Sequence, residues 1–318
     1  MSATRGWCLR LKAQPDFRVD FGGVLPTRLA GMTADEVARV EVRHGNQMLA
    51  LGELFDVAAL GGGAGDSGAA GAGVASAVVS NAVASHPGTA LASGTAPAAT
   101  AQARAEPPPE LCLEGDLSRF DAIGHGLDGG LLHIAGAVGD RLGLSMRGGE
   151  IRVNGAAGQL AGCEMAGGLI EIAADVGDFA AGALPGSMDG MRGGTLIVRG
   201  NAGARCGDRM RRGTVVLHGD AGDFLASRMV AGTIAVAGRV GAHCGYGMRR
   251  GTLVFAGPPP AVPFTFVATH HDIAVFWTLL RRSLAYHGGR FGALPARAPR
   301  RLVGDLAVDG KGEWLLPG

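Results

Sequence analysis

Residues 191–228, MRGGTLIVRGNAGARCGDR followed by MRRGTVVLHGDAGDFLASR, decide the fold, because they are two consecutive copies of one 19-residue unit. Each copy is centred on a glycine, Gly194 in the first and Gly213 in the second. Seven such units fill residues 127–257, and their anchor glycines are Gly130, Gly149, Gly168, Gly194, Gly213, Gly232 and Gly251. A constant period of this kind is typical of a stacked fold in which each unit contacts mainly its neighbours.

Each unit carries the pattern of a short strand, because the second and fourth residues after the anchor glycine are apolar. These pairs are Leu132/Ile134, Ile151/Val153, Ile170/Ile172, Leu196/Val198, Val215/Leu217, Ile234/Val236 and Leu253/Phe255. The alternation turns one strand face into a core. We therefore predict an all-β solenoid over 110–257, a β-helix of about seven 19-residue coils. One spacing is 26 residues instead of 19, so residues 183–189 should loop out of their coil.

The segments on either side of the repeats differ from them in composition. Residues 1–57 predict a small N-terminal α/β lobe, with a strand at 7–11, a capping box between Thr33 and Glu36, and a hairpin within 40–51. Residues 58–109 are almost entirely Ala, Gly, Ser, Thr and Pro, which predicts a disordered insertion. Residues 258–318 predict a C-terminal cap helix at 272–282 and a tail. The helix should cover the last coil, since the end of a solenoid needs covering, or dock a partner.

Composition excludes several classes of protein. The 318 residues contain 29 Lys and Arg against 28 Asp and Glu, so no global charge favours nucleic acid or a membrane surface. The five cysteines are an odd number without a C-x-x-C pair, which favours reduced thiols that pack as small apolar groups. The first residues lack the apolar stretch of a signal peptide, and no apolar run has membrane-spanning length. We therefore expect a cytoplasmic protein.

The sequence predicts no catalytic, cofactor-binding or metal-ligating residues. His270-His271-Asp272 is the densest triplet, but adjacent side chains at a helix start rarely bind one metal together. Cys206 and Cys244 share one repeat position with Leu225 between them, so we expect an apolar ladder. Residues 124–129 match G-x-G-x-x-G, but the helix that a dinucleotide site needs is replaced by a strand.

One exposed feature goes beyond packing. The two positions before the anchor glycine hold arginine in four of the repeats, and these residues are Arg147, Arg192, Arg211, Arg212, Arg249 and Arg250. Equal repeat positions stack, so these arginines should share one edge of the solenoid. The edge could be a solvated surface paired locally with acids, an interface to an acidic partner subunit, or a track for an anionic ligand.

The G-x-x-G-x-x-x-G spacing of residues 136–143 and 200–207 resembles a known solenoid family. That solenoid is shared by the carboxy-terminal domain of glutamate synthase and by the third subunit of formylmethanofuran dehydrogenase. The flanks at 52–57, 115–117 and 263–266 are similar to the formylmethanofuran dehydrogenase subunit. The resemblance implies a right-handed coil, and it covers most of 1–57 and 110–287.

The resemblance implies a function in one-carbon metabolism. It favours a non-catalytic scaffold, the third subunit of the bacterial formyltransferase/hydrolase complex, because the composition is rich in Ala, Gly and Arg. That complex moves a formyl group from tetrahydromethanopterin to a methanofuran analogue and releases formate. The alternative is the corresponding subunit of a molybdenum or tungsten formylmethanofuran dehydrogenase. A glutamate-synthase-like subunit is disfavoured by the amino-terminal lobe, and a left-handed β-helix acyltransferase by the 19-residue period.

The same resemblance implies three protein partners. These are an amidohydrolase-like subunit, a formyltransferase subunit and the second subunit of the complex. Zinc is expected in partner subunits, or molybdenum or tungsten in the alternative, and no cofactor in this chain. The carrier would be a polyglutamylated methanofuran-type molecule, whose carboxylates suit the arginine edge.

Overall fold

The computed structural model describes residues 6–60 and 107–316. Of these, residues 6–60 and 108–316 belong to one compact unit. The insertion expected at 58–109 coincides almost entirely with residues 61–106, which lie outside the described residues, so its predicted disorder stays a prediction.

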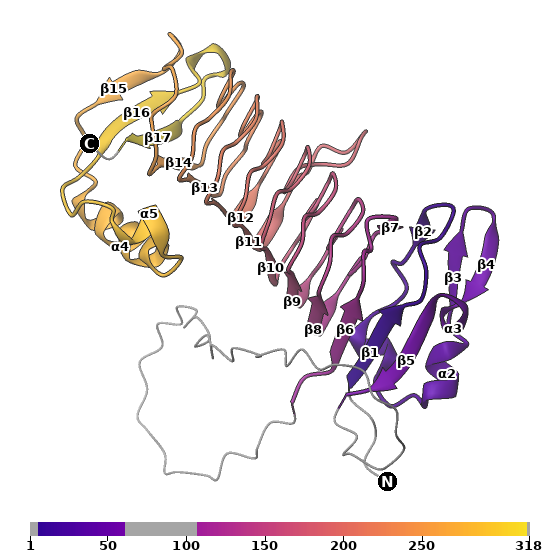
Figure 1. Ribbon diagram of the computed structural model, residues 1–318. Coiled ribbons are helices and arrows are strands. Elements are labelled where there is room, and N and C mark those ends of the chain that lie inside the picture. Colours follow the sequence, from indigo (N-terminus) through magenta and orange to yellow (C-terminus); the bar gives the residue numbers. More distant parts are fainter. Residues whose placement is uncertain (1–5, 61–106, 317–318) are drawn as a thin grey trace, which may run out of the picture. The chain divides into compact units, whose positions relative to one another are not determined.

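A sheet of 13 strands runs through this unit, in the order β15-β16-β17-β14-β13-β12-β11-β10-β9-β8-β6-β1-β5 (Figure 1). Across the central part of the sheet, from β17 through β14 to β6 and β1, every neighbouring pair is parallel. The outer strands β5, β15 and β16 pair antiparallel with their neighbours. The strands are β1 (Gly6–Leu11), β5 (Phe55–Ala59), β6 (Glu110–Glu114), β8 (Asp128–Ile134), β9 (Gly148–Val153), β10 (Leu169–Ile172), β11 (Arg192–Val198), β12 (Arg212–Leu217), β13 (Thr233–Val236), β14 (Thr252–Phe255), β15 (Val267–Thr269), β16 (Arg300–Gly304) and β17 (Gly312–Leu316). The mostly β architecture that the sequence predicts is therefore present.

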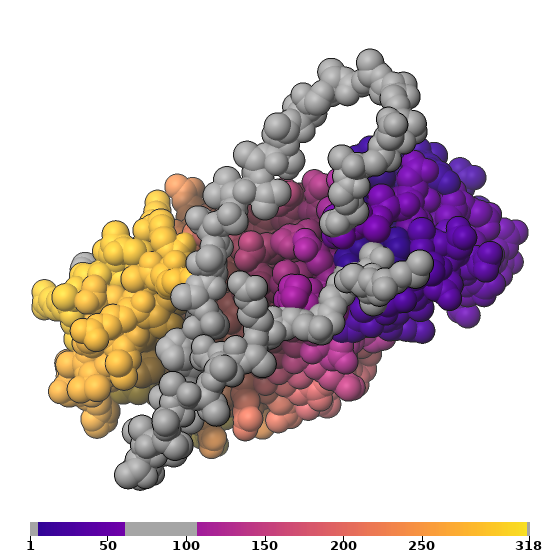
Figure 2. Space-filling model, turned by 90° about the horizontal axis from the view of Figure 1, so that it is seen from below, coloured from indigo at the N-terminus to yellow at the C-terminus, as the bar shows by residue number. Residues whose placement is uncertain are grey.

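The repeats stack in the predicted register. The first apolar position of each pair forms one column of Cα partners, and every member is at most 1% exposed: Leu132, Ile151, Ile170, Leu196, Val215, Ile234 and Leu253. Full burial of such a side chain contributes about 1.5–3 kcal/mol. Successive repeats in sequence are thus neighbours in space, as the continuous colour change along the space-filling view shows (Figure 2).

Backbone and short polar side chains join the repeats elsewhere. At Gly149 the backbone has a φ of +80°, and an added Cβ would lie 2.8 Å from the carbonyl oxygen of Gly130 in the preceding repeat, so only glycine fits there. On another side of the coil, Asp220 accepts a 2.7 Å bond from the amide of Arg239, and Asp223 one of 2.7 Å from Ala242. These side chains satisfy the next repeat's backbone where no strand does.

The seven extra residues at 183–189 leave their coil and return to it, as predicted. Gly182 closes a turn on the carbonyl of Phe179 at 2.9 Å, and Met191 rejoins the stack through a 3.1 Å bond to Ala181. Between these points Ser187 donates its amide to the carbonyl of Leu184 in a tight turn. The loop leaves Met188 69% exposed.

The amino-terminal elements form a second, four-stranded sheet in the order β4-β3-β2-β7. The elements are β2 (Val19–Asp20), α1 (Pro26–Leu29), α2 (Ala34–Ala38), β3 (Glu41–His44), β4 (Gln47–Ala50), α3 (Leu51–Leu54) and β7 (Phe120–Asp121). The predicted capping box is present at the start of α2, where Glu36 accepts a 2.7 Å bond from the amide of Thr33. The predicted hairpin is β3–β4. The predicted strand at 7–11 is β1, which lies in the long sheet.

The carboxy-terminal helix exists but lies elsewhere than expected. It is α4 (Ala274–Ala285), followed by α5 (Gly289–Gly292) and the short 3-10 helix η1 (Leu306–Val308). Its buried Trp277 and Leu284 pack with Val216 and Val254, on the outward side of the long sheet. The end strand β14 is instead covered by β17, which pairs with it in parallel. The prediction of a helix as the cap is therefore wrong in its placement, because a further strand satisfies the hydrogen-bonding edge that a helix cannot.

The helices of the described residues are short. Within residues 6–60 and 107–316, no helix is long and apolar enough to cross a bilayer. The longest helix, α4, has 12 residues, and a transmembrane helix needs about 20.

Candidate functional site

The six arginines predicted to share an edge are all exposed at the start of their strands. Arg192 and Arg212 open β11 and β12 and are register partners of each other. Arg147 directly precedes β9, and Arg249 and Arg250 come just before β14.

Five of the six line two adjoining hollows. The first, of about 360 Å³, is lined by Arg192, Arg211, Arg212, Arg250, Val230 and Ala231. The second, of about 570 Å³, is lined by Arg249, Arg250, Lys311, Asp309, Val230 and Val308. They adjoin because Arg250 and Val230 border both. Arg147 lines neither hollow, and the repeat between it and Arg192 holds Ala166 and Gly167 at the two positions before the anchor glycine.

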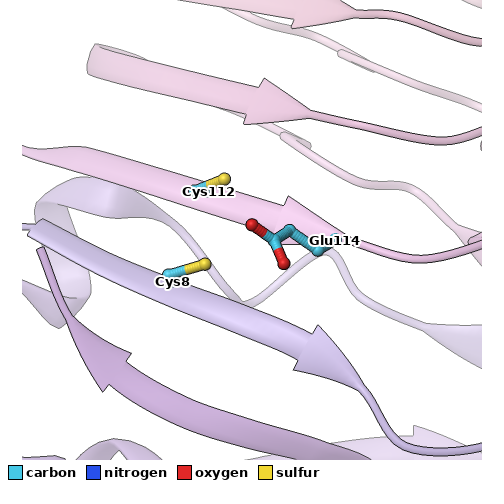
Figure 3. Close-up of side chains that lie close together, drawn as sticks. All are labelled: Cys8, Cys112 and Glu114. Atoms are coloured by element: carbon cyan, nitrogen blue, oxygen red, sulfur yellow. The ribbon is translucent and has the colours of Figure 1, made fainter. Parts of the chain in front are cut away.

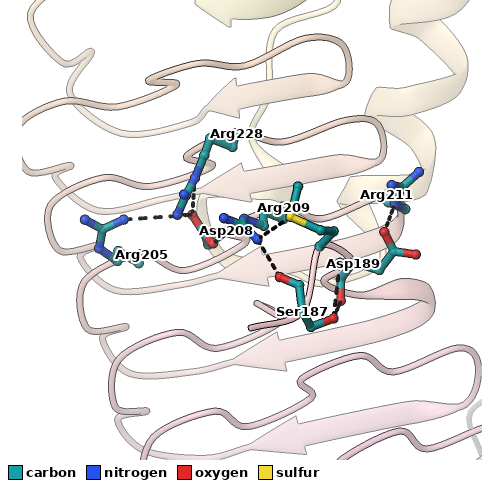
Figure 4. A network of polar contacts seen from close by, with 8 residues as sticks. Ser187, Asp189, Arg205, Asp208, Arg209, Arg211 and Arg228 are labelled. Carbon is teal, nitrogen blue, oxygen red and sulfur yellow. Dashed lines mark hydrogen bonds and ion pairs between the residues drawn. The ribbon is translucent and has the colours of Figure 1, made fainter. Parts of the chain in front are cut away.

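Most of these charges are uncompensated. Arg211 forms an ion pair with Asp189 of the inserted loop (Figure 4). In the part of the chain that the structure describes, the side chains of Arg147, Arg192, Arg212, Arg249 and Arg250 make neither an ion pair nor a hydrogen bond. Like charges held close together repel, and an anion that bridges them relieves this repulsion. The hollows therefore suit a ligand with several carboxylates or phosphates.

Lys311 is a member of this edge that the sequence analysis missed. Strand β17 pairs with β14 so that Glu313 lies opposite Thr252 and Trp314 opposite Leu253. Lys311-Gly312 thus takes the place of the next Arg-Gly pair in the stack. The sequence contained a signal for Lys311, because residues 311–316 repeat the pattern of a basic residue, a glycine and two alternating apolar residues. They do not follow the 19-residue spacing of the other repeats.

A second polar group lies beside the inserted loop and is internally satisfied (Figure 4). The carboxylate of Asp208 is only 3% exposed and accepts a 2.8 Å bond from Arg228, with Arg205 and Arg209 within 4.0 Å. Arg205 also lies 4.7 Å from the centroid of the Phe224 ring. Arg209 also donates a hydrogen bond to the carbonyl of Ser187 in the inserted loop. This network fixes the loop against the coil.

Three cysteines behave as the sequence predicts. Cys206 and Cys244 are 1% and 4% exposed, with buried Leu225 between them, so the apolar ladder is confirmed. Burial raises the pKa of Cys206 and of Cys163 to about 12. These thiols are neutral and unreactive.

The other two cysteines form a cluster that the sequence analysis did not anticipate. Cys8 on β1 and Cys112 on β6 are register partners across a parallel strand pair. Their sulfur atoms and a carboxylate oxygen of Glu114 all lie within 4.8 Å of one another (Figure 3). Within the described residues this is the one group of three potential ligand side chains so close together. His270, His271 and Asp272 line a separate hollow of about 740 Å³ and are not such a group.

Comparison with known proteins identifies the family. No protein-family model and no curated protein matches the chain. A solved structure does, with a TM-score of 0.78 and 35% sequence identity over 98% of this chain and 99% of the other. It is the X-ray crystal structure of the formyltransferase/hydrolase complex (FhcABCD) from Methylorubrum extorquens in complex with methylofuran. This match confirms the resemblance seen in the sequence. The chain belongs to the family of that formyltransferase/hydrolase complex chain.

Proposed function

We propose that the chain is a component of a formyltransferase/hydrolase complex, and that within it the chain is the third subunit, a scaffold without its own catalytic residues. The match in sequence and structure over nearly the full length of both chains supports this proposal most strongly. Formyl transfer to a methanofuran analogue and release of formate would then occur on partner subunits. A right-handed β-helix of about seven 19-residue coils is the architecture that we propose for the repeats.

The arginine edge has a specific task in this proposal. It binds the anionic tail of a polyglutamylated methanofuran-type carrier. A guanidinium binds a carboxylate through two parallel charge-assisted hydrogen bonds, and a row of them suits a chain of carboxylates. The four unpaired guanidiniums around the two hollows, those of Arg192, Arg212, Arg249 and Arg250, support this assignment. The solved relative contains methylofuran.

The test replaces two of these arginines in the assembled complex. We expect the variant R212S/R250S to bind the polyglutamylated carrier about tenfold to a hundredfold more weakly, because about 1 kcal/mol is lost for each exposed charge pair. Carrier affinity is measured by titration at low and at physiological salt, and the difference between variant and native complex should shrink as salt rises. The matched control is R43S/R239S, which removes two exposed arginines away from the edge.

The possible outcomes separate the two uses of the edge. Weaker carrier binding with an intact complex supports the carrier track. Loss of a partner subunit from R212S/R250S, but not from the control, would assign the edge to a protein interface instead. Unchanged carrier affinity and unchanged assembly would reduce the edge to a solvated surface.

A further inference from the structure

The cluster of Cys8, Cys112 and Glu114 lies outside the arginine edge and has no part in the function proposed above. Its three side chains point to the same side of the strand pair β1–β6 (Figure 3). Cys8 and Cys112 are half-buried, and the side chain of Glu114 is 35% exposed. The ligand atoms are therefore held by the sheet and remain within reach of solvent.

The cluster is a concentration of groups that become anionic, with one cation beside it. Arg10 donates a 2.8 Å hydrogen bond from Nε to Oε2 of Glu114. Burial raises the pKa of the Cys8 thiol to about 12, and the proximity of Cys112 and Glu114 adds to the rise. Burial likewise raises the pKa of Cys112. A divalent cation reverses this situation, because a coordinating thiol loses its proton outright.

We propose that Cys8, Cys112 and Glu114 form a binding site for a zinc ion. Two thiolates and one carboxylate are a ligand set that Zn²⁺ accepts in tetrahedral geometry, with solvent in the fourth position. Thiolates disfavour Mg²⁺ and Ca²⁺, and the carboxylate disfavours Cu(I), which prefers sulfur alone. Two sulfurs bound to one zinc lie about 3.8 Å apart, so groups within 4.8 Å need only small side-chain rotations to close on the metal.

The site joins two strands that are remote in sequence. Cys8 and Cys112 stand on either side of the segment 61–106 in the sequence, and among the described strands β5 pairs with the long sheet through β1. A zinc ion would fasten β1 to β6 and stabilise this end of the sheet by an amount that grows with the logarithm of the metal concentration. The site is separate from the zinc that the family resemblance implies for partner subunits.

The test uses the full-length chain, purified on its own under reducing conditions and titrated with Zn²⁺. We expect one equivalent to bind and to raise the melting temperature. Co²⁺ in its place should give a thiolate-to-cobalt charge-transfer band in the near ultraviolet. The variants C8S and C112S should bind Zn²⁺ at least a hundredfold more weakly, and E114Q about tenfold. The control E110Q removes a carboxylate from the same strand that is not in the cluster, and it should bind as the native chain does.

Two results would overturn the proposal. One is zinc binding that C8S and C112S leave unchanged. The other is a disulfide between Cys8 and Cys112 in protein taken from its native cells without reductant. If the isolated chain does not fold, the complex serves instead: its zinc content should fall by one per copy of this chain in C8S and stay constant in E110Q. The zinc measurements do not depend on carrier affinity, so their result is independent of the arginine-edge proposal.

Discussion

At the anchor position of each repeat, glycine is required for two separate reasons. Gly149 shows both: its φ of +80° is unfavourable for other residues, and a Cβ would lie 2.8 Å from the oxygen of Gly130. Gly186 in the inserted loop shows only the first, since its φ is +86° but nothing lies within 4 Å of the added Cβ. A comparison of substitutions at Gly149 and Gly186 therefore separates the cost of backbone strain from the cost of steric overlap.

We expect Gly149→Ala to destabilise the protein by about 2–5 kcal/mol, the sum of backbone strain and overpacking. Gly186→Ala should cost about 1–2 kcal/mol at most, since only the strain applies. Urea unfolding followed by circular dichroism measures both values. Equal costs for the two variants would show that contact between successive repeats does not decide the choice of glycine.

The cysteine cluster shows where residue types alone are insufficient. Five widely spaced cysteines gave no metal motif, because the two ligands that meet are 104 residues apart in the sequence. A signal existed in the strands themselves: Trp7-Cys8-Leu9 and Leu111-Cys112-Leu113 share one apolar-Cys-Leu pattern, and equal patterns in stacked strands fall in register. Only the pairing of β1 with β6 turns that similarity into a cluster.

At the scale of the elements, the outward side of the long sheet explains the position of α4. The third residue after each anchor points outward and changes character along the sheet. It is polar in the first three repeats, His133, Arg152 and Glu171, and apolar in the last four, Ile197, Val216, Ala235 and Val254. The amphipathic helix α4, which follows the repeats, packs on this apolar stretch. The outward-facing residues of the last four repeats therefore indicate where α4 packs. The alternation of inward-facing residues predicts the strands but not the helix that covers them.

The docking of the helical segment on β12 should depend on pH through His218. Burial, and then the charge of Arg199, lower the pKa of His218. Its Nε2 lies 3.0 Å from Arg199, its ring meets Phe291 edge-on, and Arg199 also donates to the carbonyl of His287. Because the folded-state pKa lies below the unfolded value of 6.5, the neutral ring contributes its full stability above that pH. The contribution is lost as the pH falls through the folded-state value.

Hydrogen exchange of residues 274–292 measures this effect. After correction for intrinsic rates, we expect faster exchange as the pH is lowered below about 6.5. His218→Gln, which cannot acquire the charge, should remove most of the response, whereas His270→Gln on the exposed loop before α4 should retain it. A response that persists unchanged in His218→Gln would assign the pH dependence to another group.

At the scale of the whole molecule, one repeat supplies three kinds of surface. Its second and fourth residues after the glycine build the core, its third builds the outward side, and the two before the glycine build the arginine edge. Periodicity predicts the first and the third of these, because they follow from position within a repeat. It does not predict the strands β1, β5, β15, β16 and β17 that extend the sheet at both ends, nor Lys311 on the edge, because these lie outside the period.

Affinity purification of the tagged chain from its native cells tests whether this chain is a component of a formyltransferase/hydrolase complex. We predict recovery of an amidohydrolase-like subunit and a formyltransferase subunit, with zinc present and molybdenum and tungsten absent. Recovery of a molybdopterin-binding subunit with iron–sulfur proteins would instead place the chain in a formylmethanofuran dehydrogenase.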